Sequence, residues 1–505
     1  MVKFDSLRST DAPELGYLKD GPPDLVTDTV TIVDLPEGGQ GQLERRVWRK
    51  LDMCVLPLAT MFYLLSFLDR ANIANAKVAG MGTELGMSSY DYSIALTITY
   101  IPYILTEIPS NLVLKMVGPD LMLPAMVTAW GLVATLQGMV TSYSGLLACR
   151  FFLGFAEGGL LPGMTLYLAS LYPREMLQTR IATFFASASL SGAFSGLLAA
   201  AISHMDGVGG RPGWAWIFIL EGLFTVLFGV ICFFLLPKSP ETARFLSPVE
   251  RSYIIRRLKE GGTASKDDSD NKVNWGEIVA TIKSPQVLIM FIINILIGTM
   301  LYGIAYFEPI IVQGLGFTGN RAQLMSAPPF AAAFVFSLSS ALISDRYGRR
   351  GLMTIFFSLW SIIGYSIFLA SGSRHAQYGA LFLTVSGTYS SCPAIIAWMA
   401  NNSAPHARRA TAVALAFIAS NLGGVFATWL FGTLSPAPDY RTATVVCIAF
   451  SAGSAVLAGV NWMYLSRKNR RKAQRRRELM MLGRREGEGE EKGMGDKSVW
   501  FVYNL

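Results

Sequence analysis

Charged residues are scarce in this chain of 505 residues. Asp, Glu, Lys and Arg together make up 15% of it, whereas soluble domains usually carry about 25%. Hydrophobic residues make up 52%, and the mean hydropathy is +0.39. This balance excludes a disordered protein and disfavours an ordinary soluble enzyme, and it indicates a protein that crosses the membrane several times.

Residues that build metal sites, disulfides and nucleotide sites are few or badly spaced. The 5 cysteines lie inside apolar stretches without a CxxC pair, and the 3 histidines are far apart in sequence, so we expect neither disulfides nor a metal site. There is no GxxxxGK[ST] loop, kinase-like set or HExxH motif, so we expect no catalytic residues and no cofactor. Without an ATP site, a gradient must drive any transport, which favours a secondary transporter and leaves a facilitator as the alternative.

What the chain has instead is twelve long apolar runs. Most are long enough to cross a hydrocarbon core of about 30 Å, and their many small residues are typical of closely packed membrane helices. The runs are 51–75, 92–114, 121–141, 145–171, 180–203, 214–236, 285–307, 323–343, 350–371, 377–399, 409–432 and 441–465.

A long polar break at 237–284 divides these runs into six and six. We therefore predict an all-α membrane protein with twelve transmembrane helices in two six-helix bundles, at 45–236 and 285–465, with the break as a cytoplasmic central loop. Residues 1–44 lack the basic start and apolar core of a signal peptide and are predicted to be a disordered cytoplasmic tail. Residues 466–505 are predicted to be a basic cytoplasmic tail.

Basic residues gather on one side of this topology. If the N-terminus is cytoplasmic, 36 of the 43 Lys and Arg residues lie on the inner side, as the positive-inside rule requires. Both termini are then cytoplasmic, and the net charge of +8 does not indicate nucleic-acid binding. The basic stretch at 467–477 predicts attraction to anionic lipid, and the alternative is a topology anchor without a specific partner.

Ionisable residues inside apolar runs are costly in lipid and usually face a cavity or a partner. Asp69 and Arg70 end a short apolar stretch, where a guanidinium can hold a carboxylate in bidentate fashion and the neighbouring carboxylate can exchange a proton. The alternative for this pair is an interfacial helix end. Arg150 and Glu157 are seven residues apart and share a helix face, so Glu157 is either a proton carrier or part of a structural ion pair with another helix.

The segment 344–350, with Asp345, Arg346 and Arg349, fits the D-R-x-G-R-R loop of the major facilitator superfamily. Arg150-x-x-x-Gly154 also resembles the fourth-helix motif of that superfamily. The resemblance assigns Arg150, Asp345, Arg346 and Arg349 structural or gating roles, and it implies the major facilitator fold.

A narrower resemblance covers about residues 45 to 465. The segments 68–77, 107–111, 150–157, 216–222 and 240–246 resemble fungal allantoate permease-type transporters of the anion:cation symporter family, which includes nicotinate and pantothenate permeases.

This resemblance implies an acid substrate that is carried with protons. It assigns substrate binding to Arg70 and proton coupling to Asp69 and Glu157. It also places Tyr103, Trp398 and Asn421 where relatives line the cavity, and packing is the alternative role for these three.

The expected function is proton-coupled uptake of a small organic anion, such as nicotinate, pantothenate or allantoate. The alternatives are efflux of a secondary metabolite that bears a carboxylate, and a nutrient-sensing transceptor. We expect a monomer in the plasma membrane, with the vacuolar membrane as the second location and with no nucleic-acid partner.

Overall fold

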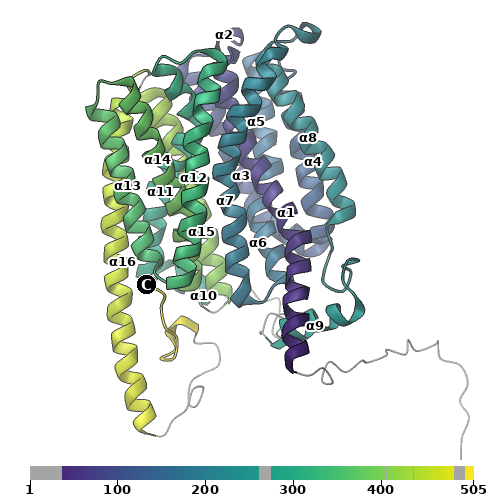
Figure 1. The fold of residues 1–505 in the computed structure, drawn as a ribbon, viewed down its shortest axis with the longest axis vertical. Coiled ribbons are helices and arrows are strands. Elements are labelled where there is room, and N and C mark those ends of the chain that lie inside the picture. Colours follow the sequence, from purple (N-terminus) through teal and green to yellow (C-terminus); the bar gives the residue numbers. More distant parts are fainter. Residues whose placement is uncertain (1–36, 261–274, 405, 436, 483–494) are drawn as a thin grey trace, which may run out of the picture.

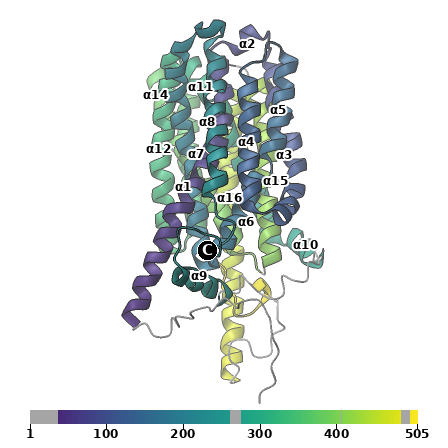
Figure 2. The same ribbon diagram turned by 90° about the vertical axis from the view of Figure 1, so that its right-hand side faces the viewer.

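Helices account for nearly all of the regular structure in a computed structural model of the chain (Figures 1 and 2). The structure describes residues 37–260, 275–404, 406–435, 437–482 and 495–505, and these ranges contain no strand. We call the end of the bundle that carries α9, α10 and the last residues of the chain the base.

Among the described residues, the first half of the chain contains eight α-helices. They are α1 (Glu37–Val78), α2 (Met81–Glu84), α3 (Ser89–Val117), α4 (Pro119–Gln137), α5 (Tyr143–Glu157), α6 (Leu160–Leu171), α7 (Arg174–Ile202) and α8 (Gly213–Leu235). The second half supplies another eight. They are α9 (Pro248–Glu260), α10 (Trp275–Ile282), α11 (Pro285–Gly314), α12 (Gly319–Tyr347), α13 (Arg350–Ala370), α14 (Arg374–Asn401), α15 (His406–Trp429) and α16 (Arg441–Met481).

Eleven helical segments of the described chain are long and apolar enough to cross a membrane. Helices α5 and α6 together form one of them, Tyr143–Leu171. The second predicted run lies in α3, which is not one of these eleven segments. Helix α3 packs against α4, α5 and α6 within the bundle. The all-α membrane fold predicted from the apolar runs is confirmed.

The helices before and after the central segment pack mainly among themselves. Contacts such as α4 with α8 and α1 with α7 hold the first group, and α13 with α14 and α11 with α15 hold the second. The two groups meet along α7 and α12, α1 and α11, and α3 and α15. The residue limits of the two predicted bundles stay a prediction.

Both predicted tails contain helix where the structure describes them. Helix α1 begins at Glu37, before the predicted boundary at residue 44, and residues 1–36 lie outside the described chain.

At the base, Lys50 donates to both carboxylate oxygens of Glu250 in α9, at 2.7 and 2.9 Å. Burial acts to raise the pKa of Glu250, but the bonds from Lys50 and from the Ser247 N–H outweigh it and hold that pKa below its usual range.

Glycines let α4 and α8 approach each other closely. A Cβ atom on Gly222 would lie 2.5 Å from the backbone nitrogen of Thr135, and one on Gly131 would lie 2.7 Å from that of Val226. Backbone atoms cannot move aside as a flexible side chain can, so this contact requires small residues, as membrane helix interfaces commonly do.

We expect Gly222→Ala and Gly459→Ala to change thermal stability in opposite directions. The first forces α4 and α8 apart and should cost about 1–3 kcal/mol. At Gly459 a Cβ atom would meet nothing within 4 Å, so alanine should only improve helix propensity, by up to about 1 kcal/mol. Unfolding midpoints of the purified variants measure this, and equal midpoints would contradict the close contact.

Candidate functional site

A buried ion pair between α1 and α5 forms the centre of the bundle. Arg70 Nη2 lies 2.7 Å from Glu157 Oε1, and the two residues are 8% and 2% exposed. Ser66, one helical turn before Arg70, donates its hydroxyl to the same carboxylate oxygen. Glu157 is the last residue of α5, and the helix is interrupted there by Gly158 and Gly159 before α6 begins. The pair therefore neutralises two charges that neither lipid nor apolar packing could accommodate singly.

The second half of the chain completes the surroundings of Arg70. Arg70 Nη1 donates to the hydroxyl of Tyr302 in α11 at 3.0 Å, and that hydroxyl donates to Asn421 Oδ1 in α15 at 3.2 Å. One guanidinium thus links α1 and α5 to α11 and α15. Because these contacts join both helix groups, movement of one group against the other must break or replace them.

Aromatic rings surround the same guanidinium. Its central carbon lies 5.0 Å from the ring centre of Phe67, 5.3 Å from that of Tyr103 and 5.5 Å from that of Tyr302. These distances allow cation–π attraction, which is strongest where water is excluded. The rings therefore add to the hydrogen bonds that hold Arg70 in place.

A small cavity adjoins Arg70. It measures about 20 Å³, which is room for one water molecule. Its walls come from both helix groups and include Ser66, Arg70, Tyr103, Tyr302, Cys392 and Ser420. A nicotinate-sized molecule does not fit this space, so the structure represents a closed form of the centre.

A second cavity of about 60 Å³ lies between the centre and the base. It shares Phe185, Ile396 and Phe417 with the central cavity. The rings of Phe185 and Phe417 stack with centres 6.0 Å apart and planes 11° apart. This aromatic pair, one ring from each helix group, separates the two spaces.

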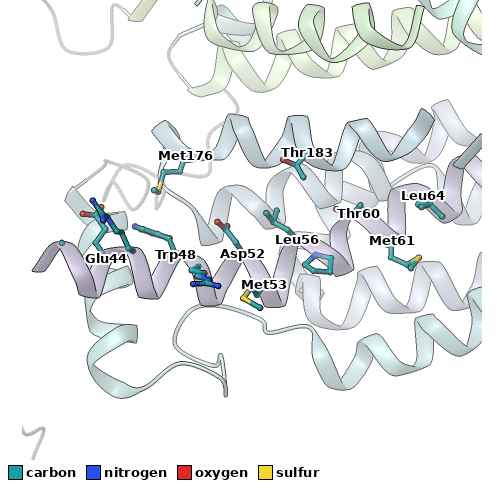
Figure 3. A pocket seen from close by; sticks show the side chains of 14 residues that line it. Glu44, Trp48, Asp52, Met53, Leu56, Thr60, Met61, Leu64, Met176 and Thr183 are labelled. Atoms are coloured by element: carbon teal, nitrogen blue, oxygen red, sulfur yellow. The ribbon is translucent and has the colours of Figure 1, made fainter. Parts of the chain in front are cut away.

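A larger groove of about 990 Å³ runs along the first turns of α1 beside α7 (Figure 3). Its walls include Trp48, Leu56 and Met61, and Asp52 in its wall pairs with Arg180 at 2.8 Å. The groove contains neither Arg70 nor its partners and is open to the outside of the bundle, so it is not the candidate site.

Asp69 points away from Arg70, although the two are consecutive. Successive residues of a helix are about 100° apart, and Asp69 accepts a hydrogen bond from the indole of Trp130 in α4. One turn further along α1, Asn72 donates to Glu221 of α8 and accepts from Ser195 of α7. These polar contacts fasten α1 to its neighbours, and Asp69 is not in the wall of the central cavity.

Arg150 does not pair with Glu157. Its side chain is buried, and its guanidinium lies 5.9 Å from the ring centre of Phe218. Among the described residues, its Nε and Nη2 atoms have no hydrogen-bond partner. Glu157 instead pairs with α1, which agrees with the alternative of an ion pair to another helix.

The remaining predicted site residues lie in three places. Tyr103 lines the cavity. Asn421 accepts the hydrogen bond from the Tyr302 hydroxyl. Trp398 is fully buried away from the cavity and donates to the carbonyl oxygen of Asn504 at 2.9 Å, because the last residues of the chain fold back onto α14.

The D-R-x-G-R-R loop lies at the junction of α12 and α13. Arg346 and Arg349 are exposed there, and Gly348 takes a positive φ of 63° that ends α12. Asp345 lies in α12, but its side chain is outside what the structure describes.

Tyr302, Tyr306 and Tyr100 were not predicted as site residues. Tyr302 and Tyr306 are one turn apart on α11 and stack with centres 6.1 Å apart, and the Tyr306 hydroxyl lies 3.1 Å from that of Tyr100. Two hydroxyls with helical spacing inside an apolar run were the available signal, since buried hydroxyls need partners.

Comparison with known proteins places most of the chain in one family. The chain matches the model described as Major Facilitator Superfamily over residues 59–319 and 290–487. It is 34% identical to an uncharacterized transporter of Schizosaccharomyces pombe, with 84% of each chain covered. It is 30% identical to the high-affinity nicotinic acid transporter of Saccharomyces cerevisiae, with 85% of this chain and 79% of that one covered.

Solved structures show the same fold. The proton:xylose symporter XylE of the major facilitator superfamily, bound to 6-bromo-6-deoxy-D-glucose, matches with a TM-score of 0.64 and 16% identity. The match covers 82% of this chain and 95% of that one.

We expect Arg70→Leu and Glu157→Leu each to lower the unfolding midpoint strongly, because each leaves the other charge buried and unpaired at a cost of about 3–5 kcal/mol. The double variant should recover much of the loss. Thermal unfolding of the four purified proteins measures this. Strictly additive losses would show that the pair does not couple.

Proposed function

The chain belongs to the major facilitator superfamily, and from that premise we propose that it imports a small organic anion together with protons. It is a multi-pass membrane protein and a secondary transporter by family. The proposal concerns the substrate class, the coupling ion and the direction.

One observation carries the proposal: the Glu157 carboxylate is paired with the Arg70 guanidinium at the wall of the central cavity. A carboxylate is therefore the group that this guanidinium binds in the closed form of the centre. A substrate carboxylate would make the same charge-assisted bond. The substrate carboxylate would reach Arg70 once the ion pair with Glu157 breaks.

Protonation of Glu157 is the simplest way to release Arg70. A neutral carboxyl group loses most of its attraction to the guanidinium, and a substrate carboxylate then restores the balance of charge inside the bundle. Proton and anion enter together because either alone leaves one uncompensated buried charge. Asp69, next in sequence but bound to Trp130, is a second candidate proton site, coupled to α4.

The substrate class is supported by the site and by one relative. The rings of Tyr103, Phe67 and Tyr302 around Arg70 suit a flat or partly apolar carboxylate. The nicotinic acid transporter is one relative at 30% identity. Nicotinate, pantothenate and allantoate are the first candidates within the anion:cation symporter family.

We place the base on the cytoplasmic side because the basic residues gather there. The proton gradient then drives uptake. Opening of the centre toward the base requires Phe185 and Phe417 to separate. The exit route then runs through the cavity of about 60 Å³ between the centre and the base. The plasma membrane is the proposed location.

Wild-type protein in vesicles should accumulate labelled nicotinate, pantothenate or allantoate when an inward proton gradient is imposed. At low substrate concentration, Arg70→Lys should reduce the uptake rate about tenfold or more. Lysine keeps the charge but not the two parallel donors. Arg441→Lys, at an exposed position on α16, is the matched control. Undiminished uptake by Arg70→Lys would rule out bidentate recognition, and export under the same gradient would reverse the direction.

Glu157→Gln should abolish accumulation against a gradient but keep exchange of labelled for unlabelled substrate. Glutamine neither gains nor loses a proton at neutral pH, and its neutral carbonyl oxygen competes for Arg70 more weakly than a carboxylate does. Asp439→Asn, an exposed loop residue, controls for loss of one acidic group. If Glu157→Gln still concentrates substrate, the proton is carried elsewhere.

A further inference from the structure

The last residues of the chain form a structured cap on the base. Helix α16 continues through the basic stretch to Met481, and the final residues return beside it (Figure 1). Asn504 bonds through its N–H and carbonyl to the side chain of Asn402 at 2.7 and 2.9 Å, and Tyr503 exchanges two hydrogen bonds with Asn469. Lys472 donates to the carbonyl oxygens of Asp496 and Ser498 at 2.6 and 2.8 Å.

This cap encloses a pocket of about 470 Å³ between α10, α11, α15 and α16. That volume lies within the usual range for small-molecule sites. The pocket is separate from the Arg70 cavity and shares no wall residue with it.

Positive charge dominates the walls of the pocket. Its basic members are Arg408, Lys468, Arg471, Lys472 and Lys497, and its one acidic member is Asp496. Asp496 is already paired with Arg408, as is Glu277. Among the described residues, no carboxylate lies within ion-pair distance of Arg471 or Lys497, so their charge is available to a ligand.

The N-terminus of α11 opens into the same pocket. Ser284, Pro285, Gln286 and Val287 line it, and no side chain caps the helix. The first N–H groups of a helix of 30 residues therefore lack intrahelical partners and carry partial positive charge, which favours a bound anion.

Gln286 supplies an independent observation that points to a ligand in this pocket. Its side chain is 3% exposed, and its Nε2 donor has no hydrogen-bond partner among the described residues. Leaving a buried donor unsatisfied destabilises the folded chain, and a ligand oxygen in the pocket would satisfy that donor.

We propose that this pocket binds a small anion that carries two or more phosphate groups. Several cations, helix N–H groups and an amide donor converge on one space, which suits the many acceptor oxygens of such a ligand. The phosphates come either from a soluble phosphorylated metabolite or from the headgroup of a phosphorylated membrane lipid, since the pocket lies where α11 and the basic part of α16 leave the predicted apolar runs.

The test is binding to the full chain reconstituted in phosphatidylcholine nanodiscs, with inositol trisphosphate as the soluble probe. A second arm includes phosphatidylinositol bisphosphate in the nanodisc bilayer and measures whether this lipid competes with the soluble probe. Probe binding that the lipid does not reduce identifies a metabolite site, and probe binding that the lipid abolishes identifies a headgroup site. Both results support the proposal, and binding in neither arm overturns it.

Two neighbouring arginines provide a matched pair of variants. Arg471→Gln should weaken binding about tenfold, because it removes a charge-assisted bond. Arg470→Gln removes the same charge one position away, at an exposed residue outside the pocket, and should leave binding within about twofold. Equal losses in the two variants would reduce the site to a non-specific basic surface.

Gln286→Leu tests the pocket without a change of charge. It should weaken binding several-fold while leaving the unfolding midpoint unchanged or raised, because an unsatisfied donor is removed. This variant also keeps the proposal testable if Arg471→Gln does not fold. Unchanged binding by Gln286→Leu would show that the ligand does not reach α11.

Discussion

The pairing of Arg70 with Glu157 is the constraint to which the centre of this transporter conforms. Two charges buried among apolar helices must neutralise each other, because lipid offers them no solvent. The break between α5 and α6, the hydroxyl of Ser66 and the aromatic rings around the guanidinium all serve to hold that pair in one geometry. Tyr302 then extends the network to the other helix group.

Helix α1 distributes its polar residues among several neighbours. Arg70 turns toward α5 and α11, Asp69 toward α4, and Asn72 toward α7 and α8. A helix that was polar on one side only would make a single seam. With polar groups around its circumference, α1 contacts helices of both groups, so a shift of one contact affects the others.

The apolar runs sufficed to predict the membrane-spanning segments, because length and hydropathy are local properties, but α9 and α10 lie in the polar break and were not predicted. The apolar runs also located Arg70 and Glu157, since charges stand out in an apolar sequence. They did not separate Asp69 from Arg70, because adjacent residues differ in direction only once neighbouring helices are placed. The resemblance places Trp398 in the cavity, whereas its indole donates a hydrogen bond to the carbonyl oxygen of Asn504, 106 residues away in the chain. No local pattern predicts such a contact. For Tyr302, the helical spacing of two hydroxyls marks the residue, but it does not identify Arg70 as its partner.

Helix α16 is continuous for 41 residues, from the membrane run into the space below the base. About 16 of these lie beyond the predicted run, which makes a rod of about 24 Å at 1.5 Å per residue. A rigid rod that is fixed in a tilting helix group acts as a lever. A tilt of about 10° would move its free end by about 4 Å, by the same helix dimensions. Any such tilt at the transport centre would therefore become a larger displacement at the far end of α16.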